Sequence, residues 1–514
     1  MGTRGYRVFR HKGRYFVYYN HCDSYPSGLG LGVLHGIPRN VSKKEFEEWV
    51  KLTGERLDAQ YESLKKSSGG HYVTEEQPEN DLFIEWIYEI DLDNFVFHVD
   101  SQPLFRLDNM PPDDVFLKAI SYDHFGHRAF DEHAPVQFRY DWRAQPPPPP
   151  PKSLMAYNSF SNRSSTTSFH DILRTPMSLS LIERARMALV ELLVTRCMVE
   201  HRVGHNLRVL ENVSDREHIP QSMLELALSL VNFAVGPPIS PLPCIPHGNN
   251  WDFIWIREDV CLRIATHLDD DDNLRASIGD LVHHINTTQD KVGTVYGIAC
   301  SIFHCAVVRI DKDKDGRGTT SFAHTPALQF LPSFYAKKIS TPGIEALSKL
   351  GCQSSVEILA AISKAHGLPR ITHKESLAAR SVITEVPVEV WMNVGQSFSS
   401  PIDLVGLASI SPQAMSAAAD LARYPWVMSL RFVDFVGSIS LIPETTESEH
   451  SKHYHCRLDS AKFISVQDGR RINVELVELY YRMFAESNLL PFKLQSVQAD
   501  LSGPVVVMDE DLAP

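Results

Sequence analysis

Residues 2–33 read GTRGYRVFRHKGRYFVYYNHCDSYPSGLGLGV, and this stretch decides the fold of the amino-terminal region. Tyr6–Phe9 and Tyr15–Tyr19 are rich in aromatic and β-branched residues, which favour strands. The polar His11-Lys12-Gly13 linker between them predicts a tight hairpin. Aromatic side chains on both faces of the two strands indicate that both faces are buried.

A helix and a second hairpin are expected after this first hairpin. Ser42 with Glu45 three residues later predicts a capping box, and apolar residues then recur at helical spacing. Two further strands are expected at 82–92 and 95–99 because their apolar runs flank an Asp-Asn turn. Residues 1–143 are therefore predicted to form an N-terminal ββαββ module.

A proline run follows this module. Pro146–Pro151 is an uninterrupted run of six prolines, which favours the extended polyproline II conformation. The sequence after it is rich in Ser, Asn and Thr, so residues 144–170 are expected to be a linker. A ligand for an SH3 or WW domain is the alternative interpretation.

The remainder of the chain is predicted to be a mainly helical domain at 171–383 and a mixed region at 384–514, so that the fold class is α+β. Helices are expected at Leu181–His201, Gln221–Val235, Ile256–His267, Leu274–Ile285, Gly343–Leu350, Ser354–Ala365, Leu377–Ile383 and Val474–Glu486. Strands are expected at Leu430–Leu441, Tyr454–Val466 and Val505–Met508. Val292–Ile310 is compatible with an apolar helix or a buried strand, which periodicity alone does not separate.

The composition predicts an intracellular globular protein. With 514 residues, 43% of them hydrophobic, the chain can fill two or three packed domains. A net charge of -13 argues against nucleic acid as a partner, because binding to a phosphate backbone needs clustered cations. No run approaches the roughly 20 apolar residues of a membrane span. Eight scattered cysteines without a CxxC pair favour reduced thiols, and hence the cytoplasm or nucleus.

The turn after the first hairpin contains three candidate catalytic residues. His21, Cys22 and Asp23 supply a base, a nucleophile and an orienting carboxylate, the groups that thiol-based acyl transfer uses. Because neighbours on a strand point to opposite faces, a working dyad needs a partner from elsewhere. The module offers three such imidazoles, His98, His124 and His127. In the alternative interpretation, Asn20, Asp23 and Ser24 hydrogen-bond backbone groups in a structural turn.

Two metal-binding patterns are incomplete. The segment at 311–316 copies the first half of an EF-hand loop, but Phe322 stands where the loop needs a bidentate carboxylate. The second pattern has irregular spacing and comprises His450, His453, His455 and Cys456. No dinucleotide or P-loop fingerprint is present. We therefore expect neither a metal nor a cofactor.

The segment at 386–427 reads VPVEVWMNVGQSFSSPIDLVGLASISPQAMSAAADLARYPWV and resembles a degenerate F-box. The resemblance rests on Pro387, Glu389-Val390-Trp391, Asp403-Leu404-Val405, Leu407-Ala408, Asp420 and Trp426. It implies a three-helix motif that binds a Skp1-type adaptor of a ubiquitin ligase. Gly395 and Gln396 depart from the family, which usually carries a large apolar pair there. An ordinary helical hairpin, begun at Pro401-Ile402-Asp403, is the alternative.

The chain as a whole resembles a family of long proteins from mushroom-forming fungi. The resemblance rests on TRGYRVFRHKGRYFVYYNHCDSYPSGLG (3–30), EIDLDNFVFHVD (89–100) and HTPALQFLPSFYA (324–336), and it implies no activity. We therefore expect a non-catalytic interaction or scaffold protein with a protein partner, in its more specific form an F-box-like substrate receptor. The alternative is a hydrolase or transferase that uses Cys22 or His21.

Overall fold

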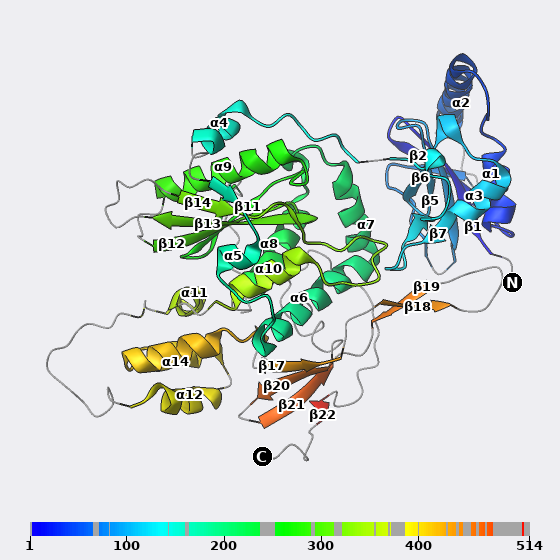
Figure 1. The fold of residues 1–514 in the computed structure, drawn as a ribbon. Coiled ribbons are helices and arrows are strands. Elements are labelled where there is room, and N and C mark those ends of the chain that lie inside the picture. Colours follow the sequence, from blue (N-terminus) through cyan, green and yellow to red (C-terminus); the bar gives the residue numbers. More distant parts are fainter. Residues whose placement is uncertain are drawn as a thin grey trace. The chain divides into compact units, whose positions relative to one another are not determined.

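The structure is a computed structural model, and its described residues fall into two compact units (Figure 1). The first unit is Met1–Arg143 with Pro443–Cys456, and the second is Ala144–Ile442 with Arg457–Pro514. The predicted α+β class is confirmed. The described residues are 3–64, 71–81, 83–141, 143–159, 164–236, 252–288, 293–312, 321–353, 356–368, 371, 386–398, 400–427, 430–437, 441–445, 454–458, 462–467, 470–475 and 506–507.

A six-stranded sheet with the order β3-β2-β1-β4-β5-β6 organises the first unit. Its strands are β1 (Gly5–His11), β2 (Arg14–Asn20), β3 (His71–Thr74), β4 (Trp86–Asp91), β5 (Val96–Val99) and β6 (Gln102–Arg106). Strands β1 and β4 are parallel, and the other neighbours are antiparallel. The predicted hairpin is β1–β2, and its turn residues Lys12 and Gly13 both have positive φ angles, 53° and 72°.

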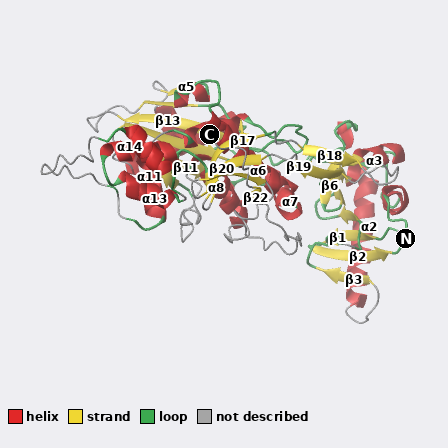
Figure 2. Ribbon diagram, turned by 90° about the horizontal axis from the view of Figure 1, so that it is seen from below, coloured by secondary structure: helices red, strands yellow, loops and turns green. Residues whose placement is uncertain are grey.

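Helix α2 (Lys43–Leu64) lies against one face of this sheet (Figure 2). It begins at the predicted capping box, because the Ser42 backbone N–H donates to Glu45 Oε2 at 2.8 Å and the Glu45 N–H donates to Ser42 Oγ at 3.3 Å. Phe46 of α2 joins Phe9 and other aromatic side chains of the sheet in one buried core. The helical spacing of the apolar residues in α2 is thus explained by its contact with the sheet.

Shorter elements complete the first unit. They are η1 (Pro26–Gly30), α1 (Leu31–Leu34), η2 (Leu107–Asn109), α3 (Asp113–Ala119), β7 (Ile120–Tyr122), β8 (Arg128–Phe130) and η3 (Val136–Phe138). Strands β18 (Leu441–Thr445) and β19 (Tyr454–Leu458) pair with each other, and residues 443–445 and 454–456 of them belong to this unit. The predicted ββαββ order is therefore present, and the sheet also includes β3 after the helix and β6 after the second hairpin.

A seven-stranded sheet with the order β10-β11-β12-β13-β14-β9 and β15 beside β13 forms the centre of the second unit. Its strands are β9 (Ser164–Thr166), β10 (Ile254–Arg257), β11 (Val260–Ile264), β12 (Gly293–Cys300), β13 (His304–Lys312), β14 (Ser321–His324) and β15 (Leu328–Gln329). The helix predicted at Ile256–His267 is wrong, since most of this run forms the β10–β11 hairpin. The run at Val292–Ile310, which fits either a helix or a strand by its sequence, forms the two strands β12 and β13 in its described residues.

Helices pack on this sheet or on one another. They are α4 (Pro151–Ser159), α5 (Phe169–Leu173), α6 (Leu181–Val199), α7 (His201–Val209), α8 (Gln221–Val235), α9 (Asp271–Thr288), α10 (Pro342–Gly351) and α11 (Val356–Ala365), with the short turns η5 (Leu210–Asn212) and η6 (Arg216–His218). The predictions for α6, α8, α9, α10 and α11 are confirmed. Leu377–Ile383 lies outside the described residues.

The expected linker at 144–170 contains regular structure. Helix α4 packs on α9, where Ser153 Oγ donates to Asp280 Oδ2 at 2.9 Å. Strand β9 joins the edge of the sheet in parallel with β14. Residues 151–159 and 164–166 therefore belong to the folded second unit, because tertiary contacts stabilise a segment whose composition alone favours a linker.

Three short helices and a small sheet end the second unit. The helices are α12 (Val388–Gln396), α13 (Pro401–Ala408) and α14 (Pro412–Ala422). The sheet has the order β16-β17-β20-β21-β22, with β16 (Trp426–Val427), β17 (Leu430–Val436), β20 (Lys462–Gln467), β21 (Arg470–Glu475) and β22 (Val506–Val507). The first two residues of the helix predicted at Val474–Glu486 lie in β21, and the rest fall outside the described residues. Among the described helices, none is both long and apolar enough to cross a membrane.

Candidate functional site

The turn after β2 folds into a hydrogen-bonded corner. Asn20 Nδ2 donates to Ser24 Oγ at 2.9 Å and also to the carbonyl of Cys22. Ser24 is fully buried, its N–H donates to Thr3 Oγ1 at 3.1 Å, and its carbonyl accepts a hydrogen bond from the Tyr88 hydroxyl at 3.0 Å. The corner is thus anchored to Thr3, two residues before β1, and to β4.

A close backbone approach tightens the same corner. Asp23 has a φ of 54°, and its carbonyl accepts a hydrogen bond from the Leu29 N–H at 2.9 Å. A Cβ atom on Gly28 would lie 2.2 Å from the same Asp23 oxygen. Position 28 therefore requires glycine for steric reasons, which accounts for one of the glycines that follow the turn.

The predicted catalytic residues lie at the surface of this corner. His21, Cys22 and Asp23 are all exposed, and the His21 ring meets the Tyr19 ring edge-on at 6.3 Å. Among the described residues, no hydrogen bond joins Cys22 Sγ or the His21 ring to another side chain. Of the expected partners, His127 is buried in the β7–β8 turn. The catalytic role of the three residues stays a prediction.

Strands β4 and β5 assemble a different group of ionisable side chains. Glu89 and Asp91 are two residues apart on β4 and therefore share one face of the sheet. His98 on β5 is the cross-strand partner of Glu89. One oxygen or nitrogen atom from each of the three side chains lies within 4.8 Å of the other two. Glu89 and Asp91 are 2% and 0% exposed, so both carboxylates are buried, whereas His98 is partly buried.

Asp91 is held as a carboxylate by its neighbours. It accepts hydrogen bonds from the backbone N–H groups of Asp93 at 2.8 Å and Asn94 at 3.0 Å, from Asn94 Nδ2 at 2.8 Å, and from Arg10 Nη1 at 3.1 Å. Burial alone would raise the pKa of Asp91, but the nearby His98 ring, these hydrogen bonds and the Arg10 charge lower it to about 2.

Glu89 and His98 are less well satisfied. Among the described residues, Glu89 Oε1 and both ring nitrogens of His98 have no hydrogen-bond partner. His98 Nε2 lies 3.7 Å from Asp91 Oδ2, which is an ion-pair distance but too long for a hydrogen bond. Burial raises the pKa of Glu89, and the His98 and Arg10 charges oppose this shift.

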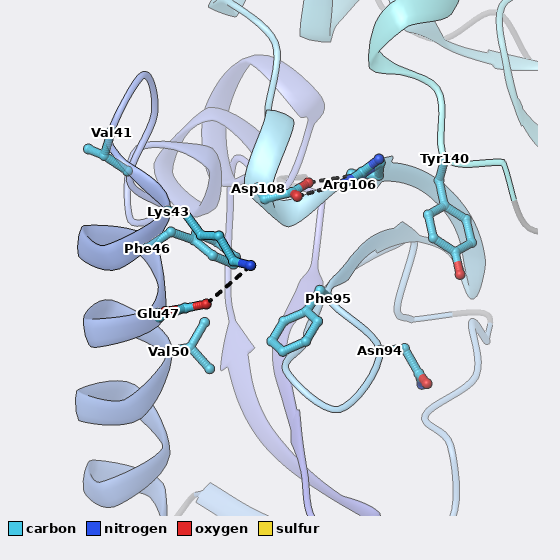
Figure 3. Close-up of a pocket in the computed structure, with 10 residues that line it drawn as sticks. All are labelled: Val41, Lys43, Phe46, Glu47, Val50, Asn94, Phe95, Arg106, Asp108 and Tyr140. Carbon is cyan, nitrogen blue, oxygen red and sulfur yellow. Dashed lines mark hydrogen bonds and ion pairs between the residues drawn. The ribbon is translucent and has the colours of Figure 1, made fainter.

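A pocket of about 590 Å³ lies between α2, the β4–β5 turn and β6 (Figure 3). Its apolar wall includes Phe46 and Val50 of α2, and the Phe46 ring meets the Phe95 ring edge-on at 6.1 Å. The volume is within the range of small-molecule sites. Asn94 also lines the pocket, and its side-chain amide donates a hydrogen bond to Asp91 of the ionisable group.

The F-box-like segment forms three short helices around a core of their own. Helices α13 and α14 each begin at a Ser-Pro pair: Ser400 Oγ accepts from the Ile402 N–H at 3.2 Å, and Ser411 Oγ accepts from the Ala414 N–H at 3.1 Å. Leu404, Leu407, Leu421 and Trp426 are among the buried residues of this core, which α11 extends.

Several apolar side chains of the three-helix segment point to solvent. Val390 and Val394 of α12 are 47% and 41% exposed, and Ile402 of α13 is 37% exposed. Positions four residues apart lie on the same face of a helix, so Val390 and Val394 form one apolar stripe.

Comparisons of the chain with protein-family models, with curated proteins and with solved structures find no match. Function is therefore inferred from the contacts and exposure of the described residues.

Proposed function

We propose that this chain is a non-catalytic protein-interaction subunit in which α12–α14 bind a Skp1-type adaptor protein. The observation that carries the proposal is the exposed apolar stripe of Val390 and Val394, together with Ile402 on the next helix. Helices α13 and α14 already bury apolar side chains in a core that α11 shares, and Trp391 and Met392 of α12 pack against this core. Exposed apolar residues on helices whose inner face is filled are typical of a surface that binds another protein.

The packing around Gly395 supports the F-box-like interpretation despite the departure from the family at this position. A Cβ atom on Gly395 would lie 2.4 Å from Leu421 Cδ1 and 3.0 Å from Leu407 Cδ2. The two leucines therefore fill the space that a larger side chain on α12 would occupy. The interior of the three-helix segment is therefore filled at this position by large side chains of α13 and α14, whereas the F-box family usually has large apolar residues on the first helix.

Two arginines, buried Arg431 and partly exposed Arg423, attach the three helices to the rest of the second unit. Arg431 of β17 donates to the carbonyls of Gly395 at 3.4 Å and Gln396 at 2.9 Å, at the carboxyl end of α12. Arg423, which follows α14, donates from Nε to the Cys352 carbonyl at 2.7 Å. Cations at helix carboxyl ends stabilise carbonyl groups that have no partner within the helix. These bonds hold α12–α14 as a fixed platform for a partner.

The test is the affinity of the full chain for a purified Skp1-type adaptor, measured by isothermal titration calorimetry. The double variant Val390→Glu/Val394→Glu is expected to weaken binding by at least about 100-fold, because two apolar contacts worth roughly 1.5 kcal/mol each are lost. Leu52→Glu is the matched control, since Leu52 is a 57% exposed apolar residue of α2. Equal affinity of the double variant and the wild type, or no binding by the wild type, contradicts the proposal.

A further inference from the structure

We propose that Glu89, Asp91 and His98 form a binding site for one divalent transition-metal cation, with Mn²⁺ or Zn²⁺ as suitable ions. The site is distinct from the three-helix segment and from the corner at His21–Asp23. It rests on the register of β4 and β5, which places Glu89 opposite His98. It also rests on the pleat of β4, which turns Glu89 and Asp91 to the same face.

The spacing of the three side chains suits a single ion. Carboxylate and imidazole ligands lie about 2.0–2.2 Å from a transition-metal ion, so two ligands of one ion are at most about 4.4 Å apart. The atoms that Glu89, Asp91 and His98 offer lie within 4.8 Å of one another. Small side-chain rotations therefore bring all three into a coordination sphere, without movement of the strands.

The unpartnered polar atoms give a second, independent indication of a ligand. Glu89 is 2% exposed, yet its Oε1 has no hydrogen-bond partner among the described residues, and the same is true of both ring nitrogens of His98. A buried carboxylate oxygen without a partner is strongly destabilising, and buried polar groups in proteins are nearly always satisfied. A bound cation satisfies Glu89 and His98 at once.

The donor set selects the kind of ion. Two carboxylates and one imidazole are oxygen and nitrogen ligands without a thiolate, a combination that suits Mn²⁺, Fe²⁺ or Zn²⁺. Ca²⁺ and Mg²⁺ prefer all-oxygen sites, so an imidazole disfavours them. Three protein ligands leave further coordination positions for water or for a ligand atom.

Arg10 is the internal competitor of the cation. Its Nη1 donates to Asp91 Oδ2, and Asp91 also accepts three hydrogen bonds from Asp93 and Asn94, which together use the four acceptor positions of a carboxylate. An entering cation must therefore displace Arg10. Asp93 offers Arg10 an alternative partner, because Arg10 Nε lies 3.7 Å from Asp93 Oδ2. The Tyr15 ring, 5.5 Å from the guanidinium carbon, supports the Arg10 side chain from β2.

The test is a Mn²⁺ titration of the full chain, in which electron paramagnetic resonance measures the free ion. The wild type is expected to bind one equivalent of Mn²⁺, and Glu89→Gln and His98→Ala are each expected to weaken this binding by at least about tenfold. Arg10→Met is expected to tighten it, since it removes the competing cation. His35→Ala is the matched control, because His35 lies 2.8 Å from the Asp113 carboxylate in an exposed pair of the same unit.

The readouts separate a metal site from a buried ionic network. Thermal unfolding without metal establishes that each variant is folded, and Mn²⁺ is expected to raise the melting temperature of the wild type but not of Glu89→Gln. No bound equivalent in the wild type, or Glu89→Gln and His98→Ala variants that bind as the wild type does, overturns the proposal. Arg10→Met with unchanged affinity removes Asp91 from the ligand set and overturns the three-ligand site.

Discussion

The most quantitative prediction concerns Glu191, a carboxylate buried in α6. Glu191 is only 7% exposed, and its Oε1 accepts a hydrogen bond from the Ser340 hydroxyl. Burial raises the pKa of Glu191 from 4.5 to about 7, and the Ser340 hydrogen bond opposes this shift. At pH values between these two, the folded chain holds a proton that the unfolded chain has released.

The sign of the effect follows from this proton. Stability around α6 is expected to fall as pH rises from about 4.5 to about 7, and to remain lower above that range, by about 3 kcal/mol in total. Glu191→Gln keeps the shape and an acceptor for Ser340 but removes the titration. The variant is therefore expected to be more stable than the wild type at pH 8 and similar to it at pH 5.

Hydrogen–deuterium exchange of α6 peptides measures this difference, with the wild type and Glu191→Gln compared at each pH so that intrinsic exchange rates cancel. At pH 8 the slowest α6 amides are expected to exchange up to about 100-fold more slowly in Glu191→Gln. Glu217→Gln is the control, since Glu217 is exposed in η6. A ratio between variant and wild type that stays constant from pH 5 to pH 8 refutes the account of Glu191.

Two further substitutions test the turns of the first unit. Gly28→Ala is expected to destabilise this unit by about 1–3 kcal/mol, because the new Cβ atom meets the Asp23 carbonyl oxygen at 2.2 Å. Thermal unfolding measures this loss of stability. An unchanged melting temperature would contradict the close approach of Gly28 to Asp23. Asp93→Ala is expected to lower stability by about 1–2 kcal/mol, because the Asp93 carboxylate accepts the N–H groups of Lys12 at 2.7 Å and Gly13 at 2.9 Å. Amide exchange at Lys12 and Gly13 should accelerate in this variant, and unchanged exchange there contradicts the hydrogen bonds.

Elements with a complete local pattern were predictable from the sequence. The start of α2 is an example, because Ser42 and Glu45 satisfy each other within one helical turn. The prediction of a helix at Ile256–His267 is wrong. A short apolar run fits both the helical and the strand periodicity, and the pairing of β11 with β12 is what makes this run a pair of strands. Pro151 ends the proline run and also begins α4, a role that depends on the contact of α4 with α9.

The candidate metal site was not predictable, because it depends on contacts between distant residues. Glu89 and Asp91 show in the sequence only as two acidic residues in an apolar strand, and their burial depends on the position of β4 inside the sheet, between β1 and β5. The sequence suggests His98 as a partner for Cys22, whereas the structure places it beside Glu89. A hairpin register assigned to EIDLDNFVFH would have placed Glu89 opposite His98 and so indicated the group of Glu89, Asp91 and His98.

The central proposal is that the adaptor contacts α12 and α13, the two helices of the α12–α14 segment that carry exposed Val390, Val394 and Ile402. Its most direct test is hydrogen–deuterium exchange of the full chain with and without a Skp1-type adaptor at saturating concentration. The account predicts slower exchange at Val388–Gln396 and Pro401–Ala408, with exchange in β1–β6 unchanged. Unchanged exchange in both helices, or protection confined to the first unit, would contradict it.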